Sequence, residues 1–121
     1  WFGFRGTFKE PGLAIINFTK IESGLQGGGG TSAINGGVIA AGFDAAFVLA
    51  GLGHYDSKVV VTLELSVKFL SLALVSESLA FQAHLVRSAK NFSFAEGFLY
   101  QAGTVPAQHL AIATAMVAPA R

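Results

Sequence analysis

Apolar and polar residues alternate along several segments of this chain, which is the pattern of strands with one buried face. The alternation is cleanest from Val61 to Phe69, where apolar residues stand at every second position. Five further segments show a weaker form of the pattern or an apolar run between turns: 2–8, 13–18, 79–87, 92–100 and 109–117. Proline, glycine or polar residues punctuate the chain at 10–12, 88–91 and 103–106. These positions predict turns, and therefore strands joined as hairpins.

A different pattern covers 36–50, where apolar residues surround a single acid, Asp44. Its length and its content of Ala and Leu predict a helix, and a helix that is apolar on nearly all sides is a buried one. Gly51-Leu52-Gly53 is the expected stop. The predicted order is two strands, a helix and four strands. That order favours an α+β fold, with an antiparallel sheet wrapped around one long central helix and a single domain over 1–121.

A membrane span is the rival interpretation of this apolar stretch, because 33–53 has about the right length. Asp44 lies near its centre, and an acid there costs about 2.5 to 3.5 kcal/mol. Several glycines weaken the span further. A buried core helix is therefore the favoured prediction, with no membrane as partner.

Composition adds a prediction about assembly. Hydrophobic residues make up 52% of the chain and charged residues 12%, whereas an average soluble domain carries about a quarter charged residues. We therefore expect part of the apolar surface to be buried against a second copy. A net charge of +1 indicates no nucleic-acid partner.

The chain contains no cysteine, which excludes disulfides, cysteine zinc sites and a thiol nucleophile. This fits a reducing compartment, and a cytoplasmic location is expected. No cluster with metal-ligand spacing is visible, and no cofactor is predicted. The chain starts at Trp1 and not at Met, so we expect a segment to precede it.

The segment from Thr19 to Asn35 is polar and rich in glycine, with four consecutive glycines at 27–30. Such a run forms either a plain flexible loop or a loop that lets a ligand or a second backbone come close. The sequence leaves both possibilities open.

Asp44 is the only charged residue between Glu22 and Asp56. Its helical neighbours at three and four positions, Ala40, Ala41, Phe47 and Val48, are all apolar. A buried carboxylate is costly unless it is paired. Asp44 therefore either meets a partner from elsewhere in the chain or opens onto a functional site.

The predicted helix start suggests what such a site contains. Asn35 is a good N-cap residue, and Gly36 and Gly37 leave the first-turn N–H groups unshielded by side chains. These donors suit an anion or a developing oxyanion, although two glycines also serve close packing. Asp44 lies about 10 Å beyond Gly37 along the helix axis. Because that is far for one carbonyl, a two-fold dimer is expected to bring the donors of one helix to the carboxylate of the other.

The stretch from Asn35 to Asp44 resembles the signature of the phenylacetate-type hotdog thioesterases, which include enzymes like 4-hydroxybenzoyl-CoA thioesterase. That signature is His-Gly-Gly, then six residues, then Asp, and here Asn35 stands in place of His. The resemblance extends over nearly the whole chain, through the opening hairpin with Pro11-Gly12, the strand end at 66–70 and the hairpin at 87–94. It implies the hotdog fold and acyl-CoA as the ligand.

The resemblance also implies roles for individual residues. Asp44 matches the acid that activates water or attacks the thioester carbonyl, and the Gly37 N–H matches the donor that polarises this carbonyl. The Asn35 amide retains a hydrogen-bond donor at the position of the usual His. Thr62 resembles the hydroxyl that orients the water in some members of the family.

Coenzyme A in such enzymes lies in a groove between protomers, with its phosphates near basic residues of a hairpin. Arg87 and Lys90 stand on the matching hairpin, where plain surface charge is the alternative interpretation. Gly36 and His54 are the other predicted substrate contacts. His84 and His109 lie on predicted strands and are expected to be surface or internally paired residues.

The sequence thus predicts an acyl-CoA thioesterase that assembles as a homodimer, with a dimer of dimers as a possibility left open. The alternative is a non-catalytic acyl-CoA-binding or structural dimer, which the change to Asn35 favours. A hotdog hydratase or dehydratase ranks last, because such enzymes need a His near an acid and the predicted helix contains none.

Overall fold

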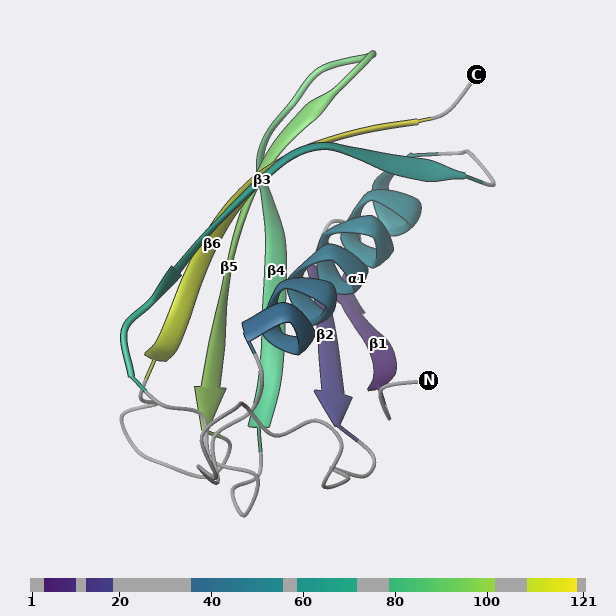
Figure 1. Ribbon diagram of the computed structural model, residues 1–121. Helices are drawn as coiled ribbons and strands as arrows, with labels where there is room; N and C mark the ends of the chain where they lie inside the picture. Colours follow the sequence, from purple (N-terminus) through teal and green to yellow (C-terminus); the bar gives the residue numbers. More distant parts are fainter. Residues whose placement is uncertain are drawn as a thin grey trace.

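The described part of the chain forms six strands and one helix, in the predicted order (Figure 1). The computed structural model describes residues 4–10, 13–18, 36–55, 59–71, 79–101 and 109–119. The elements are β1 (Phe4–Glu10), β2 (Leu13–Phe18), α1 (Gly36–His54), β3 (Val60–Phe69), β4 (Leu79–Ser88), β5 (Ser93–Gln101) and β6 (His109–Pro119). The predicted α+β class is confirmed. The turns at 11–12 and 103–106 and the glycine run at 27–30 lie outside the described residues.

The strands form one antiparallel sheet in the order β1-β2-β4-β5-β6-β3. Figure 1 shows this sheet curving around α1, which crosses a single face of it. Strand β3 follows the helix in sequence but lies at the far edge, beside β6. This crossover places an edge strand next to the helix, and the candidate site depends on that placement.

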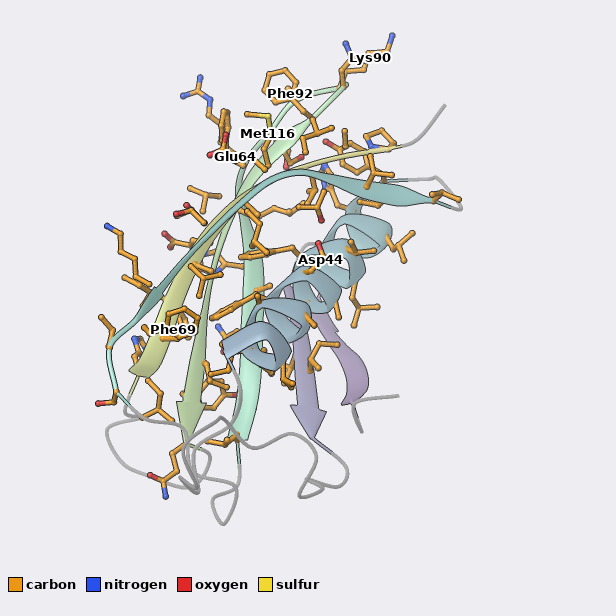
Figure 2. The ribbon with its side chains drawn as sticks, in the orientation of Figure 1. Asp44, Glu64, Phe69, Lys90, Phe92 and Met116 are labelled. Carbon is orange, nitrogen blue, oxygen red and sulfur yellow. The ribbon has the colours of Figure 1, made fainter. Side chains whose placement is uncertain are left out.

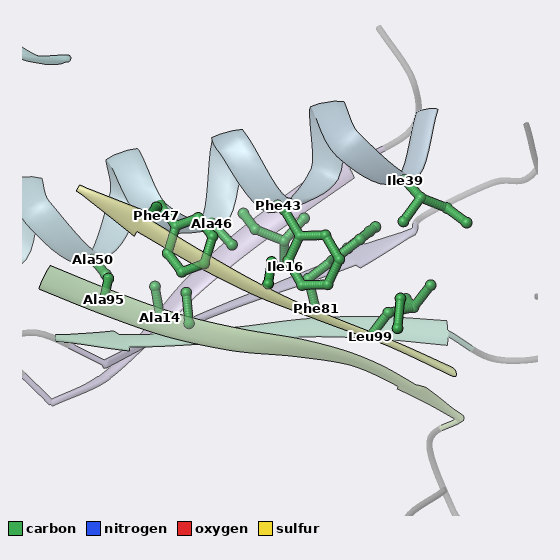
Figure 3. Packing of buried hydrophobic residues seen from close by; sticks show 14 of the residues in the cluster. Ala14, Ile16, Ile39, Phe43, Ala46, Phe47, Ala50, Phe81, Ala95 and Leu99 are labelled. Atoms are coloured by element: carbon green, nitrogen blue, oxygen red, sulfur yellow. The ribbon is translucent and has the colours of Figure 1, made fainter. Parts of the chain in front are cut away.

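The core lies between α1 and the sheet (Figure 3). Phe43 and Phe47 on the helix are fully buried and stack on each other, and Phe43 meets the ring of Phe81 edge-on at 5.1 Å. Glycine makes room for these rings at Gly97, where a Cβ would lie only 2.5 Å from the Gln82 carbonyl oxygen and 3.2 Å from Phe47. The helix is therefore held in one register over the sheet.

The predicted helix stop is wrong, because α1 continues through Gly51 to His54. Gly51 is buried, and a Cβ on it would lie 2.7 Å from the Val60 side chain. Glycine at this position serves the close approach of the helix to the sheet and does not end the helix. Tertiary packing here overrides the low helix propensity of glycine.

The continuous alternation predicted for β3 is also wrong at its start. The register between β3 and β6 shifts between Thr62 and Glu64, so Leu63 is an extra residue at a bulge. Val60 and Thr62 therefore lie on the same sheet face as Leu65 and Val67 beyond the bulge. Leu63 is left 56% exposed. The bulge is what turns the polar Thr62 toward the helix.

Among the described residues, α1 is long and apolar enough to cross a membrane by length and composition. Its contacts explain this composition, because one face of the helix packs on the sheet and includes four side chains with no exposed surface: Phe43, Ala46, Phe47 and Ala50. The opposite face was predicted to be buried as well. In the single chain its residues, such as Ala45 and Val48, are only partly buried.

Candidate functional site

Asp44 and Thr62 form the centre of the candidate site. The hydroxyl of Thr62 on β3 donates a hydrogen bond of 2.6 Å to Oδ1 of Asp44 on α1. Figure 2 shows Asp44 on the side of the helix next to β3. Both side chains are partly buried. The described partner of Asp44 is therefore a neutral hydroxyl group, and no ion pair of Asp44 occurs among the residues the structure describes.

The residues around Asp44 on the helix are apolar, and they remain partly exposed to solvent. On α1 Asp44 lies among Ala40, Ala41, Ala45 and Val48, all partly buried. The second carboxylate oxygen, Oδ2, has no protein partner in the described part of the chain. An oxygen in this position can accept a proton from a water molecule or from a ligand.

The first turn of α1 begins at Gly36 and Gly37, and both residues are exposed. N–H groups in the first turn of a helix point along its axis, toward the positive end of the helix dipole. The ring of Phe69, which is 56% exposed, lies 3.4 Å from the position that a Cβ of Gly36 would take. An exposed aromatic side chain therefore lies beside the helix start, which the sequence did not indicate.

Three other predicted site residues, His54, Arg87 and Lys90, lie on other parts of the fold. His54 is at the end of α1, about 15 Å from Asp44 along the axis, where its ring meets Tyr55 at 4.8 Å. Arg87 and Lys90 are exposed residues of the β4–β5 hairpin, and Lys90 lies at the tip (Figure 2). Asn35 lies outside the described residues, so its role stays a prediction.

The remaining histidines are on the sheet. His84 Nε2 lies 2.9 Å from Glu96 Oε1, and His109 stacks on Phe98 at 4.2 Å. The described contacts of both histidines are therefore with residues other than Asp44. A hydratase needs a histidine near its acid, so these contacts disfavour the hydratase interpretation.

Two hollows occur on the sheet face opposite α1, with volumes of about 350 Å³ and 240 Å³. Both involve Glu96 and Thr114, and neither includes Asp44 or Thr62. These two hollows are therefore separate from the candidate site. No group of three or more His, Asp or Glu side chains suited to a metal occurs within the described ranges.

The family of this chain follows from its sequence. The model of the thioesterase superfamily matches residues 32–107, which is more than half of the 121 residues. The chain belongs to this superfamily. The match includes α1 with Asp44 as well as Thr62 and the β4–β5 hairpin. No functionally curated protein matches the chain.

Solved structures share the fold at low sequence identity. The PaaI protein of Escherichia coli, from the phenylacetic acid degradation operon, has a TM-score of 0.84 at 14% identity, covering 99% of this chain and 81% of its own. A thioesterase family protein from Silicibacter pomeroyi has a TM-score of 0.83 at 23% identity, covering 97% and 84%. A Streptococcus mutans protein solved with acetyl-CoA has a TM-score of 0.79 at 18% identity, covering 95% and 86%. The predicted hotdog fold is confirmed.

Proposed function

We propose that this protein is an acyl-CoA thioesterase that hydrolyses an acyl- or aryl-CoA to the free acid and CoA. The observation that carries the proposal is the Asp44 carboxylate, held by the Thr62 hydroxyl at 2.6 Å on the central helix of a thioesterase-superfamily fold. The acetyl-CoA bound to the Streptococcus mutans protein of the same fold supports a CoA thioester as ligand. A cytoplasmic location is proposed with it.

In the proposed reaction Asp44 takes a proton from water, whose oxygen adds to the thioester carbonyl carbon. The Gly37 N–H and the Asn35 amide donate to the oxyanion that forms. The carbon–sulfur bond then breaks, and the proton passes from Asp44 to the CoA thiolate. Attack by Asp44 itself, followed by hydrolysis of the resulting anhydride, gives the same products and uses the same residues.

The site is proposed to be completed by a second copy of the chain. Strand β3 has a neighbouring strand on one side only within the described sheet, and exposed apolar side chains follow it at Val61, Leu63 and Phe69. A long apolar edge strand invites pairing with another strand. Because Thr62 of this same strand holds Asp44, a partner added at the edge lies close to the carboxylate.

Pairing of the β3 edges about a two-fold axis sets the two copies of α1 side by side and antiparallel. The first turn of one helix then approaches Asp44 of the other. The partly buried apolar face of α1 around Asp44 supports the same assembly, because a second helix would cover it. We propose a homodimer with two shared sites. Whether these dimers pair further is left to measurement.

The function is tested by incubating the protein with acetyl-, hexanoyl-, benzoyl- and phenylacetyl-CoA and following thiol release. The chain has no cysteine, so a thiol-reactive dye reports only liberated CoA. We expect release well above the uncatalysed rate for at least one substrate. Saturable binding of all four without release would contradict the proposal and favour a non-catalytic acyl-CoA-binding dimer.

Thr62→Val is expected to lower kcat by about tenfold, which corresponds to about 1.4 kcal/mol. Valine keeps the shape of threonine but removes the hydrogen bond that orients Asp44. Thr62→Ser is the matched control, because it keeps the hydroxyl and should retain most of the rate. Steady-state kinetics on one acyl-CoA decides the point. An unchanged kcat in Thr62→Val would show that the Asp44 orientation does not depend on this bond.

A further inference from the structure

Tyr55, the residue that follows α1, ties the end of the helix to the β4–β5 hairpin. Its phenol oxygen lies 2.5 Å from the Ser93 hydroxyl oxygen and donates to the Ala89 carbonyl at 3.0 Å. A phenol has a single hydrogen, so donation to Ala89 makes Ser93 the donor in the shorter bond. Ser93 is the only polar side chain among the fully buried described residues. The Tyr55 hydroxyl therefore contacts the hairpin at two points, Ser93 at its base and Ala89 in its turn.

The part of the hairpin that Tyr55 reaches is exposed. Residues 86–92 are all exposed, and the turn is closed by the Ala89 N–H donating to the Phe92 carbonyl at 2.8 Å. A register shift between Leu85 and Arg87 bends β4 at the start of this segment. Figure 1 shows the hairpin extending beyond the rest of the sheet. Tyr55 thus links the end of α1 to this exposed segment.

Ser93, which Tyr55 contacts, lies in the same row of paired residues as Thr62 of the candidate catalytic pair. Val117 of β6 pairs with Ser93 on one side and with Thr62 on the other. Ser93 and Thr62 are therefore two strands apart in one row, about 10 Å at the spacing of neighbouring strands. Both side chains face α1, where Ser93 meets Tyr55 and Thr62 meets Asp44. One row of paired residues across β5, β6 and β3 connects the two hydrogen-bonded pairs.

We propose that Tyr55 is a positioning residue for coenzyme A. It fixes the hairpin that carries Arg87 and Lys90 at a set distance and direction from Asp44, so that these cations meet the phosphates of CoA while the thioester reaches the carboxylate. This inference rests on the proposed function. A tether that pre-orders a hairpin raises affinity, because ligand binding no longer has to order it.

Tyr55→Phe removes only the hydroxyl and keeps the ring. We expect KM for an acyl-CoA to rise about three- to tenfold with kcat within about twofold, since one hydrogen-bonded tether is lost. The same acyl group on N-acetylcysteamine lacks the nucleotide and its phosphates, and its kcat/KM should not change. Ser93→Ala should behave in the same way, and the double variant should add little to either single change.

Tyr100→Phe is the matched control. Burial raises the pKa of Tyr100, and this tyrosine lies on β5 about 23 Å from Ser93 at the usual rise of a strand. Its hydroxyl is expected to leave both substrates unaffected. Equal losses in Tyr55→Phe on the acyl-CoA and on the N-acetylcysteamine thioester would overturn the proposal, as would no loss on either.

Calorimetry with CoA alone separates this inference from the proposed function. If the parent hydrolyses nothing, the thioesterase proposal fails, but Tyr55→Phe must still weaken CoA binding about three- to tenfold. Amide exchange in 88–92 should also become faster in this variant and not in Tyr100→Phe. An unchanged Kd for CoA, or a parent that does not bind CoA, would refute the positioning role.

Discussion

We expect Asp44→Asn to lower kcat for acyl-CoA hydrolysis by about 10²- to 10⁴-fold, the range that a positioned general base contributes. The amide keeps the size of the carboxylate, and its oxygen can still accept the hydrogen bond from Thr62. It cannot take a proton from water or attack a carbonyl. The loss therefore falls on the chemical step, and the affinity for the substrate should stay nearly constant.

Steady-state kinetics with CoA release as the readout measures this effect, with thermal unfolding of the same samples as the check on folding. Asp44→Ala is the companion variant, because it removes the acceptor of Thr62 as well as the charge. Equal rates in Asp44→Ala and the parent would eliminate Asp44 from the mechanism. Intact CoA binding with lost turnover in both variants would assign it to catalysis.

The two paths open to Asp44 differ in where a heavy oxygen label goes. In a single turnover in H₂¹⁸O, water activation places the label in the released acid and leaves Asp44 unlabelled. Direct attack forms an anhydride, and hydrolysis at the Asp44 carbonyl carbon would leave ¹⁸O in the carboxylate. Label in the peptide that contains Asp44, found by mass spectrometry, would therefore establish direct attack. An unlabelled peptide fits water activation and also an anhydride that is hydrolysed at the acyl carbon of the substrate.

The fold was predictable because each strand has a local signal in its alternation or its flanking turns. Two details were not, and both arise from tertiary contacts. Gly51 has the local appearance of a helix stop, and only the position of Val60 against it shows that the helix continues. The bulge at Leu63 leaves no sequence signal, since the apolar alternation runs through it without a break.

The same bulge limits what the sequence shows about the site. In an unbroken strand Thr62 would face away from the side that carries Leu65 and Val67, and so away from the helix. The isolation of Asp44 indicated that it needs a partner, but periodicity alone pointed away from the hydroxyl that supplies it. The resemblance to hotdog thioesterases suggested Thr62. The register shift supplies the physical reason.

Tyr55 and Ser93 had no signal of this kind. A tyrosine after a helix and a serine after a turn are ordinary residues, and their bond joins positions 38 residues apart. The bond between Tyr55 and Ser93 forms because the chain crosses over after α1 to reach β3, and because β5 pairs with β6 beside β3. Residues whose role depends on such long-range register are visible only in the folded chain.

A mixture of two inactive variants should recover activity if the site is shared between protomers. One variant is Asp44→Ala, which lacks the acid. The other is Gly37→Pro, which lacks the first-turn N–H and is tolerated there because proline fits the first turn of a helix. In a mixed dimer with shared sites, one site carries both defects and the other carries neither.

Random reassembly of equal amounts gives about half mixed dimers, each with one intact site, so about a quarter of the parent activity should return. The variants are unfolded together, refolded and assayed for CoA release, with native mass spectrometry giving the fraction of mixed dimers. Each variant refolded alone is the control and should stay inactive. If one protomer supplies both groups to its own site, every site in the mixed dimer keeps one defect. No recovery would then be seen, and the 10 Å between Gly37 and Asp44 along the helix would have to be spanned within a single chain.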